Sequence, residues 1–513
     1  MKEQYGARRM RKTKDRRELV RTRRVSCIHP FVVPFVYPLF FLSILFWGLA
    51  GQPVRAEQVQ MPVTVEVADT VWLEVMSPGN GGPIPNLTGF IYFDERLTEP
   101  LRQLQDPIVS IDQIFDLIIP VEYLSDGRVK ADFTGLGDVL TSIARSGDRL
   151  AIWTDFTPQA LSPVPYLDNS LRRNQPPISY KAWEDLVYQT ARYVLVEKKM
   201  QVAYWPVWNE PDLGMFWDVD HRRYTHGAMT ARNPELWNPS RIRQAASGQL
   251  NEVARLIEYM KLYEVTARAI KRVDPDARVG GPNPSSFNKR WLTTFLNHSK
   301  EQNLPVDFIT WHYPAYPEEH KKNVQWLRTW AVQRGIELPP IVITEWHANR
   351  GSAGDPWIEA VDVIEIAMGM MDTQVEAAFY YTVYNIADVE SGLLTPVGQA
   401  FKSLGKLQGT HLSCNTSPEI MGVAAKDTAG HMAIVFRHWN QTPTNLQVKL
   451  PEGFTSYTLS LYSENNPPFH SNGSLNANSA NRRPNSRPQS LNIPLPGRCF
   501  GVLSLPAPFR KIK

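Results

Sequence analysis

Two glutamates in this sequence stand at the ends of apolar, strand-like runs, each close to a tryptophan. Glu210 ends the run WPVWNE, and Glu345 lies in the run IVITEW. In glycosidic cleavage one carboxylic acid protonates the leaving oxygen, while a second, ionised carboxyl attacks the anomeric carbon. Burial beside apolar rings disfavours the charged form and would keep the acid protonated. The pair therefore predicts glycosidic chemistry, provided that the fold brings the two side chains together.

Other side chains at these strand ends are of types that bind sugars. Asn209 directly precedes Glu210, and its amide could hold a sugar 2-hydroxyl, where hydrogen bonding strengthens in the transition state. Aromatic rings offer apolar faces to pyranose C–H groups, and the expected platforms are Trp208, Trp311, Trp346 and Tyr381. A single glutamate after a strand is more simply explained as a solvated loop charge, so the interpretation depends on the pair.

Strand and helix patterns alternate from about residue 130 to 408, and these elements must position the two glutamates. The expected strands are 148–156, 202–211, 277–282, 306–314, 339–347 and 375–385, and amphipathic helical patterns lie between them. Repeated β–α units indicate a parallel sheet, and about eight of them close into a (β/α)8 TIM barrel. A doubly wound open sheet is the alternative, but no glycine-rich phosphate turn follows an early strand.

The expected barrel spans residues 57–408, and its beginning has the weakest pattern. The run FDLIIPVEYL at 115–124 is the best candidate for the second strand. Counted from there, Glu210 ends strand four and Glu345 strand seven. Barrel enzymes carry their chemistry at the C-terminal ends of the strands, so the two carboxyls are expected to face one pocket.

Short alternating strands without helices fill residues 409–513 and predict a small β-sandwich. Residues 465–490 are polar and rich in Pro, Asn and Ser, which favours a loop inside this domain. Cys414 and Cys499 could form one disulfide in an oxidising compartment, or they could be two unrelated buried thiols. No cysteine or histidine spacing indicates a metal site.

Residues 1–56 differ in composition from the rest of the chain. They hold 12 Lys/Arg and 3 Asp/Glu, and the uncharged run 31–50 is long enough to span a bilayer. This pattern predicts an export signal, either a cleaved signal peptide or an uncleaved anchor, and hence a periplasmic or extracellular protein. The remaining residues hold 43 basic and 48 acidic side chains. Such a mildly acidic body gives no support for nucleic-acid binding.

Residues from about 130 to 408 resemble glycoside hydrolase family 39, in the clan of barrel enzymes with catalytic glutamates on strands four and seven. The resemblance rests on the stretches YKAWEDLVYQTARYV, VWNEPDL, YMKLYEVTARAIKRVDPDARVGGP, VDFITWHYP, PPIVITEWHAN and SGLLTPVGQAFKSLGKL. It implies a barrel with a small β-sandwich, a carbohydrate substrate and no metal or organic cofactor.

By position, the resemblance implies that Glu210 is the general acid/base and Glu345 the nucleophile of a retaining, two-step mechanism. The substrate would be an oligo- or polysaccharide, cleaved either by a β-xylosidase-like enzyme or by an endo-acting enzyme on an exopolysaccharide. A sugar-binding protein that kept the barrel and lost turnover is the alternative. A membrane-anchored scaffold would require that residues 31–50 stay uncleaved.

The resemblance also implies roles for residues beyond the glutamate pair. His312 matches a strand-six histidine that lies near the nucleophile, although a purely structural histidine would fit the same position. A tyrosine usually follows this histidine in the family, and here Tyr313 or Tyr316 could fill that role. Residues 216–248 depart from the pattern and could be an inserted lid.

Overall fold

The computed structural model describes residues 70–76, 82–219, 250–314, 316–348, 355–451, 453–464, 466–475 and 489–507. The expected export segment at 1–56, with its apolar run 31–50, lies outside these ranges, as does most of the expected lid at 216–248. No helix within these ranges has both the length and the apolar character needed to cross a bilayer.

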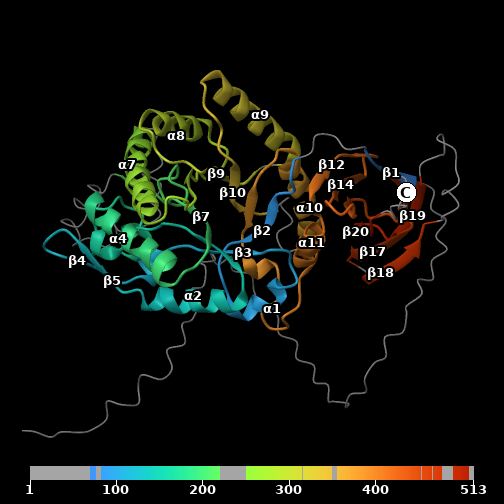
Figure 1. Ribbon diagram of the computed structural model, residues 1–513, viewed down its shortest axis with the longest axis horizontal. Coiled ribbons are helices and arrows are strands. Elements are labelled where there is room, and N and C mark those ends of the chain that lie inside the picture. The colour runs from blue at the N-terminus through green and yellow to red at the C-terminus, as the bar shows by residue number, and fades with distance from the viewer. Residues whose placement is uncertain are drawn as a thin grey trace, which may run out of the picture. The chain divides into compact units, whose positions relative to one another are not determined.

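Eight parallel strands form a closed barrel, which confirms the predicted fold class (Figure 1). Each strand pairs with the next in the chain, and Phe379 on the last strand pairs with Gly89 on the first. Glu210 therefore follows the fourth strand and Glu345 lies on the seventh, as predicted. In chain order the strands are β2 (Asn86–Phe90), β3 (Ile108–Ile111), β6 (Arg149–Ile152), β7 (Val202–Pro206), β8 (Val279–Pro282), β9 (Phe308–His312), β10 (Ile341–Trp346) and β11 (Ala377–Tyr380).

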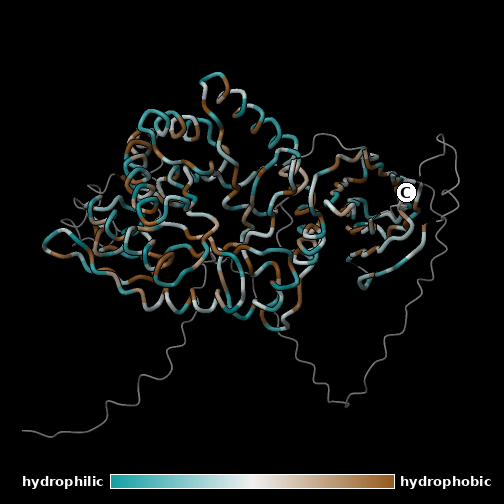
Figure 2. The backbone as a smooth tube through the Cα atoms, in the orientation of Figure 1, coloured by the Kyte–Doolittle hydropathy of each residue, from teal (hydrophilic) through white to brown (hydrophobic). Residues whose placement is uncertain are grey.

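Helices follow the barrel strands, and most of them cover the strands with one apolar face, so hydrophobic and hydrophilic residues alternate along the outer helices (Figure 2). The longer ones are α2 (Thr134–Ser146), α4 (Tyr180–Arg192), α7 (Leu250–Val273), α8 (Lys289–Glu301), α9 (Pro317–Gln333), α10 (Pro356–Asp372) and α11 (Pro396–Leu404). Short helices, α1 (Thr98–Leu101) and α3 (Asn169–Arg172), lie in loops.

Helix α10 is apolar on nearly every side because it is covered on both sides. All of its residues from Ala360 to Met371 are buried, and it contacts sandwich strand β15 (Met432–His438) as well as its barrel neighbours. Arg437 of β15 donates to the Glu365 carboxylate of α10 at 2.8 Å. A paired charge at this buried contact is satisfied, whereas an unpaired one would be costly.

The predicted second strand at 115–124 is wrong. The second barrel strand is β3, and the apolar run after it forms a π-helical turn, Ile114–Ile118, and a hairpin strand β4 (Val121–Tyr123) paired with β5 (Val129–Ala131). β3 is only four residues long and fully buried. A run that short cannot be distinguished by periodicity from the longer apolar run beside it.

The C-terminal region forms two facing sheets, which agrees with the predicted sandwich. One sheet has the order β13-β1-β16-β19 and the other β12-β14-β15-β20-β17-β18. Besides β15, their bounds are β1 (Thr70–Val75), β12 (Thr410–Leu412), β13 (Cys414–Thr416), β14 (Ile420–Lys426), β16 (Thr444–Leu450), β17 (Ser456–Ser463), β18 (Asn466–Ser474), β19 (Gln489–Leu495) and β20 (Cys499–Leu505).

Three sequence predictions for the sandwich need correction. Strand β1 pairs with β13 and β16, so the range 57–408 is not wholly barrel. Within 465–490, β18 forms a ladder with β17 despite its polar composition, because an edge strand can leave one face to solvent, and its other face is only partly buried. The disulfide is not formed: Cys414 and Cys499 are free thiols. They lie on different sheets, at the edge of one and inside the other, so no strand pairing brings them side by side.

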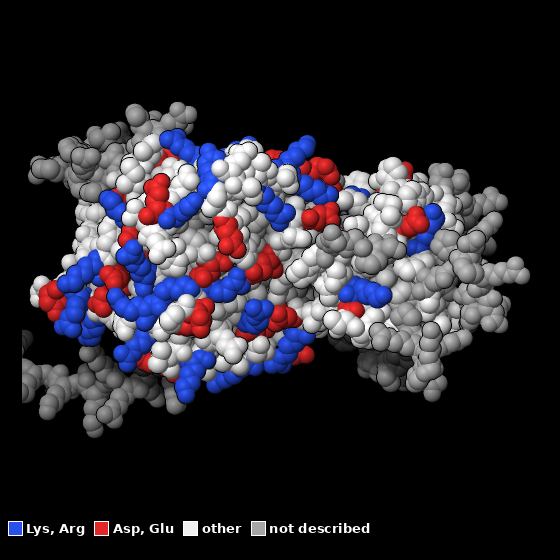
Figure 3. Space-filling model, turned by 45° about the horizontal axis from the view of Figure 1, so that its top comes forward, with Lys and Arg blue, Asp and Glu red and all other residues white. Residues whose placement is uncertain are grey.

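Acidic and basic side chains are intermixed over the face of the molecule shown in Figure 3. Several acidic and basic side chains of the described residues form ion pairs, such as Arg149 with Asp106 and Arg272 with Glu184, each at 2.7 Å. Exposed pairs of this kind contribute about 0–1 kcal/mol each. Their main effect is therefore on solubility, and the stability of the fold comes from the buried apolar core.

Candidate active site

Glu210 is carried into the barrel mouth by a sharp turn directly after β7. Trp208 and Glu210 both have left-handed backbone conformations, with φ of 65° and 45°. The Glu210 N–H donates to the carbonyl of Asn283 at 3.1 Å, which ties this turn to the loop after the neighbouring strand. The turn sends the Trp208 ring into the core and leaves the Glu210 carboxyl partly exposed.

Glu345 lies near the C-terminal end of β10, where the pairing with β9 shifts register between Ile343 and Glu345. Its carbonyl accepts a hydrogen bond from the N–H of Tyr313 at 2.7 Å. Trp346, the next residue, is buried on the opposite side of the strand. Strand alternation therefore turns Glu345 toward the mouth and Trp346 into the core.

One histidine nitrogen lies within reach of both glutamates. Nδ1 of His312 is 3.1 Å from Oε1 of Glu210 and 3.6 Å from Oε2 of Glu345. These two oxygens can be no farther apart than the sum of those distances, about 6.7 Å. Retaining glycosidases hold their carboxyls about 5–5.5 Å apart and inverting ones about 6.5–9.5 Å. The distance between the two carboxylate oxygens, at most about 6.7 Å, is thus compatible with the whole retaining range and with only the lowest part of the inverting range.

The protonation of these groups is set by opposing effects of burial and charge. Burial raises the pKa of Glu345, the neighbouring Glu210 raises it further, and His312 acts in the opposite direction. For His312, burial alone would lower the pKa, but Glu345 and Glu210 outweigh it and the pKa is raised. Nδ1 of His312 lies within hydrogen-bonding distance of Glu210, whereas Nε2 is buried and has no hydrogen-bond partner among the described residues.

A group of buried acidic residues lies at the ends of strands two and three, and sequence reasoning missed it. The fully buried Asp155 accepts from the N–H of Gln113 at 2.7 Å, and the Gln113 amide donates to Asp112 at 3.2 Å. Arg173 is held between Gln113, at 2.5 Å, and Asp116, at 3.3 Å. Burial, followed by the charges of Glu345 and Asp116, raises the pKa of Asp112 to about 7. Asp112 therefore shares an electrostatic environment with the glutamate pair.

Two tyrosines flank the glutamates from strands one and eight. Tyr92 follows β2 and Tyr381 follows β11, and their ring centroids are 5.9 Å apart. Burial raises the pKa of Tyr381, and the charges of Glu345, Asp112 and Glu210 raise it further. The predicted Tyr381 thus lies at the site. Tyr92 was not predicted, although its position after a barrel strand is the signal that could have found it.

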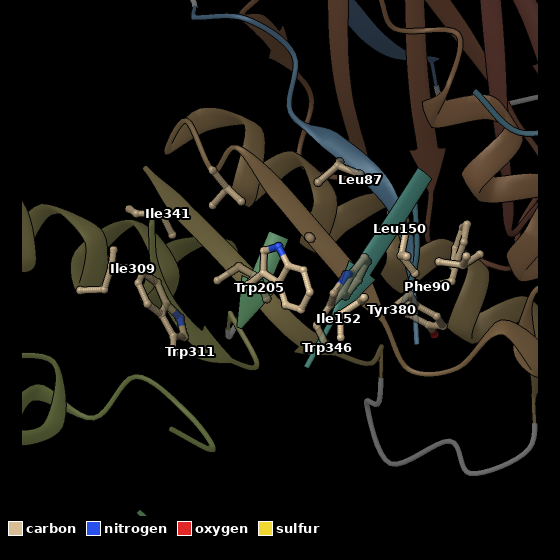
Figure 4. Close-up of a cluster of buried hydrophobic side chains, with 14 of the residues drawn as sticks. Leu87, Phe90, Leu150, Ile152, Trp205, Ile309, Trp311, Ile341, Trp346 and Tyr380 are labelled. Carbon is tan, nitrogen blue, oxygen red and sulfur yellow. The ribbon is translucent and has the colours of Figure 1, made fainter. Parts of the chain in front are cut away.

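The three tryptophans predicted as sugar platforms are instead core residues. Trp208 is fully buried and packs against Trp183 and Trp217. Trp311 and Trp346 are also fully buried, and Figure 4 shows them among the apolar side chains of the barrel core. Proximity in sequence to a glutamate did not place these rings in the mouth, because alternate residues of a strand face opposite sides.

The remaining predicted residues have different surroundings. Asn209 is partly exposed in the same turn as Glu210. Tyr313 has a left-handed backbone (φ 45°) and is tied to the Glu345 carbonyl, whereas Tyr316 precedes α9 and packs against the barrel core. Tyr313 is therefore the better placed of the two. Within the described ranges no group of three His, Cys, Asp or Glu side chains has the geometry to hold a metal ion.

Comparisons with known proteins agree with this arrangement. A model of the glycosyl hydrolases family 39 matches residues 221–326. A beta-xylosidase of Geobacillus stearothermophilus is 28% identical over 207 residues, covering 39% of this chain and 34% of that protein. A beta-xylosidase of Caldicellulosiruptor saccharolyticus is 24% identical over 353 residues, covering 61% of this chain and 65% of that protein. The chain thus matches about a third of one relative's length and just under two thirds of the other's.

Solved structures show the same fold at low sequence identity. A monomeric beta-xylosidase from Caulobacter crescentus CB15 has a TM-score of 0.60 at 18% identity, covering 86% of this chain and 100% of its own. A GH39 enzyme from Xanthomonas axonopodis pv. citri has a TM-score of 0.60 at 17% identity, covering 85% and 97%. The fold and the paired glutamates place the chain among (β/α)8 barrels with glutamates on strands four and seven. Within this class, the matches support glycoside hydrolase family 39, which agrees with the predicted resemblance. The range matched by the family model includes neither Glu210 nor Glu345, and it covers residues 221–248, so the predicted departure from the family pattern at 216–248 is wrong over that range.

Proposed function

We propose that this chain is a retaining, β-xylosidase-like glycoside hydrolase with Glu210 as general acid/base and Glu345 as nucleophile. The observation that carries the proposal is the approach of both carboxyls to one nitrogen of His312, at 3.1 and 3.6 Å. The family match and the two relatives named beta-xylosidase support the reaction class.

In the first step, a carboxylate oxygen of Glu345 attacks the anomeric carbon and forms a covalent ester. The bond from that carbon to the glycosidic oxygen breaks, and the carboxylic acid of Glu210 gives its proton to the departing oxygen. His312 Nδ1 and Glu210 Oε1 share a hydrogen bond of 3.1 Å. This hydrogen bond fixes the direction of the Glu210 carboxyl before the sugar arrives.

In the second step, water replaces the leaving group. The carboxylate of Glu210 accepts a proton from the water, whose oxygen attacks the anomeric carbon while the bond to Glu345 breaks. Two inversions give net retention. Burial is the largest effect that raises the pKa of Glu345, and the neighbouring His312 acts in the opposite direction and favours the ionised nucleophile.

The charges around the pair favour a sugar without a carboxylate. Arg173, which lies among the buried acidic residues next to the pair, is already engaged by Gln113 and Asp116. A uronate placed there would find no uncommitted cation among these side chains, and its carboxylate would be buried unpaired. Neutral pentosides or hexosides are therefore the proposed substrates, cleaved either from a chain end or within an exopolysaccharide.

Export by residues 1–56 is part of the proposal and rests on the sequence pattern alone. N-terminal sequencing of the mature protein tests it directly. A chain that begins near residue 57 is the expected result for a cleaved signal. A chain that keeps residues 31–50 would make the segment an anchor.

Hydrolysis of aryl glycosides and of bacterial polysaccharides by wild type and by Glu345→Ala tests the reaction. Loss of turnover on the order of 10⁴-fold or more is expected in the variant, because no other group can form the covalent intermediate. Unchanged turnover would contradict the nucleophile assignment. If wild type binds the sugars and cleaves none of them, the chain is a sugar-binding protein on the same barrel.

A further inference from the structure

Asn283, the residue after β8, lies between the two halves of the proposed catalytic pair and uses all of its polar atoms. Its side-chain N–H donates to the carbonyl of Trp208 at 2.7 Å, and its side-chain oxygen accepts from the Thr344 hydroxyl. Its backbone carbonyl accepts from the N–H of Glu210 at 3.1 Å, and its own N–H donates to the Thr310 hydroxyl at 3.0 Å. One side chain therefore connects the Glu210 turn to the residue before Glu345.

The backbone of Asn283 is held in a demanding conformation. The residue is fully buried, and its φ is 63°. Asparagine tolerates this left-handed region better than other residues with side chains, although glycine would do so without strain. A loop that needed only the bend would be served by glycine, so the asparagine side chain has a separate purpose. Every buried side-chain amide needs hydrogen-bond partners. The partners of Asn283 are Trp208, two residues before Glu210, and Thr344, directly before Glu345.

The next two residues extend the same loop to other groups of the site. The carbonyl of Pro284 accepts from the N–H of His312 at 2.8 Å. The N–H and hydroxyl of Ser285 donate to Asp212, two residues after Glu210, at 2.8 and 3.0 Å. Residues 283–285 therefore touch strand six, strand seven and the Glu210 turn, and Asn283 is the member that joins the last two.

We propose that Asn283 is a positioning residue that sets the distance and direction between the Glu210 and Glu345 carboxyls. The inference rests on the proposed function, in which each carboxyl must reach the same sugar from a different side. The hydrogen bond to Trp208 restrains the turn that aims Glu210, and the one from Thr344 restrains the strand that aims Glu345. Misplacement of a catalytic group by about 1 Å costs on the order of 10²-fold in rate.

Asn283→Gly tests this role because glycine keeps the backbone hydrogen bonds and relieves the left-handed strain, so that only the side-chain connection is lost. Asn303→Gly is the matched control. Asn303 also has a left-handed backbone, with φ of 49°, but it is exposed at the end of α8, away from the mouth. Thr344→Val removes the hydroxyl from the other end of the connection with little change in volume.

Turnover is measured on aryl glycosides with good and poor leaving groups, at saturating substrate and at low substrate. In Asn283→Gly we expect kcat to fall about 10²-fold on the poor leaving group and less on the good one, with KM nearly unchanged, because proton donation suffers most. Thr344→Val should lower kcat on both substrates. The double variant should lose less than the product of the two single losses, since both remove one connection. Asn303→Gly should match wild type.

Equal activity of Asn283→Gly and wild type, with both folded by circular dichroism, would overturn the inference. So would strictly multiplicative losses in the double variant. If wild type cleaves no glycoside, the proposed function fails. The positioning role of Asn283 is then tested by measuring the pKa of His312 in an NMR titration. Displaced carboxyls should lower its pKa in Asn283→Gly and leave it unchanged in Asn303→Gly, whereas the same pKa in all three proteins would refute the positioning role.

Discussion

The barrel mouth and the sandwich make their tight turns with different residues. In the mouth, left-handed backbone conformations occur at residues with large or functional side chains, namely Tyr92, Gln113, Trp208, Glu210, Asn283 and Tyr313. In the described part of the sandwich, every residue with φ in this region is glycine: Gly409, Gly430, Gly453 and Gly497. A left-handed conformation costs most residues roughly 1–2 kcal/mol and costs glycine almost nothing.

The difference shows what each region needs from its loops. A sandwich turn needs only the bend, so glycine is sufficient. A mouth turn must also deliver a particular side chain, as at Glu210, and the strain is tolerated because the surrounding hydrogen bonds fix it. Stability and activity should therefore respond in opposite ways to substitutions in the two regions.

The largest expected effect separates chemistry from stability in the mouth. Glu210→Gln should lower turnover of a glycoside with a poor leaving group by roughly 10²–10⁴-fold, because no acid protonates the departing oxygen. A substrate with a good leaving group should lose much less in the first step. Steady-state rates on both substrates, with a thermal melt of each protein, check this. Equal losses on the two substrates would contradict the acid/base role.

A sandwich glycine should show the reverse behaviour. At Gly497, with φ of 111°, an added Cβ would lie 2.4 Å from the carbonyl oxygen of Gln441. Gly497→Ala should lower the free energy of unfolding by about 1–3 kcal/mol while turnover per folded molecule stays unchanged. Chemical denaturation measures the free energy of unfolding, and the rate divided by the amount of folded protein measures turnover. A variant as stable as wild type but with reduced turnover would contradict the contrast between the two regions.

An effect no larger than the one at Gly497 sharpens the comparison through the pH dependence of stability. The pKa of Asp112 is raised from 3.8 to about 7 in the folded protein, first by burial. The folded state therefore holds a proton that the unfolded chain releases between these values, so this residue's contribution to stability is lost as pH rises from about 4 to about 7. In Asp112→Asn this loss should be absent. The free energy of unfolding should therefore fall less between pH 5 and pH 8 in the variant than in wild type, by about 1–3 kcal/mol. Melting curves of wild type and variant at pH 5 and pH 8 test this prediction. The same change in stability between the two pH values in both proteins would contradict it.

The sequence predicted the later part of the barrel well because its units are long and regular. Amphipathic helices such as α4 and α8 alternate with buried strands such as β9, and this pattern locates the strands that carry Glu210 and Glu345. Their strand numbers were also correct, because the wrongly placed second strand replaced β3 without changing the count. His312, at the end of one of these strands, was identified through the family resemblance and not from the strand pattern. The four-residue β3 carried too little pattern to be recognised, so Asp112, which follows it, was missed as well.

Side-chain direction was the other limit of prediction. Trp346 and Glu345 are adjacent in sequence, but only the glutamate faces the mouth. At β7 the strand ends in a turn, and the left-handed Trp208 sends its ring into the core. Such a turn depends on contacts with Asn283, which is 75 residues away from Trp208. Local pattern cannot reveal a contact at that distance along the chain.

Strand β1 has a consequence for how the chain must fold during synthesis. Leu73 pairs with Thr416, and between them the whole barrel is encoded. At about 5–20 residues per second, the partner strand is made roughly 20–70 s after β1. During that interval a strand with three buried apolar side chains, Val71, Leu73 and Val75, has no sheet to join. The nascent chain thus carries an unpaired strand, open to chaperones or to aggregation, until β13 and β16 have been made.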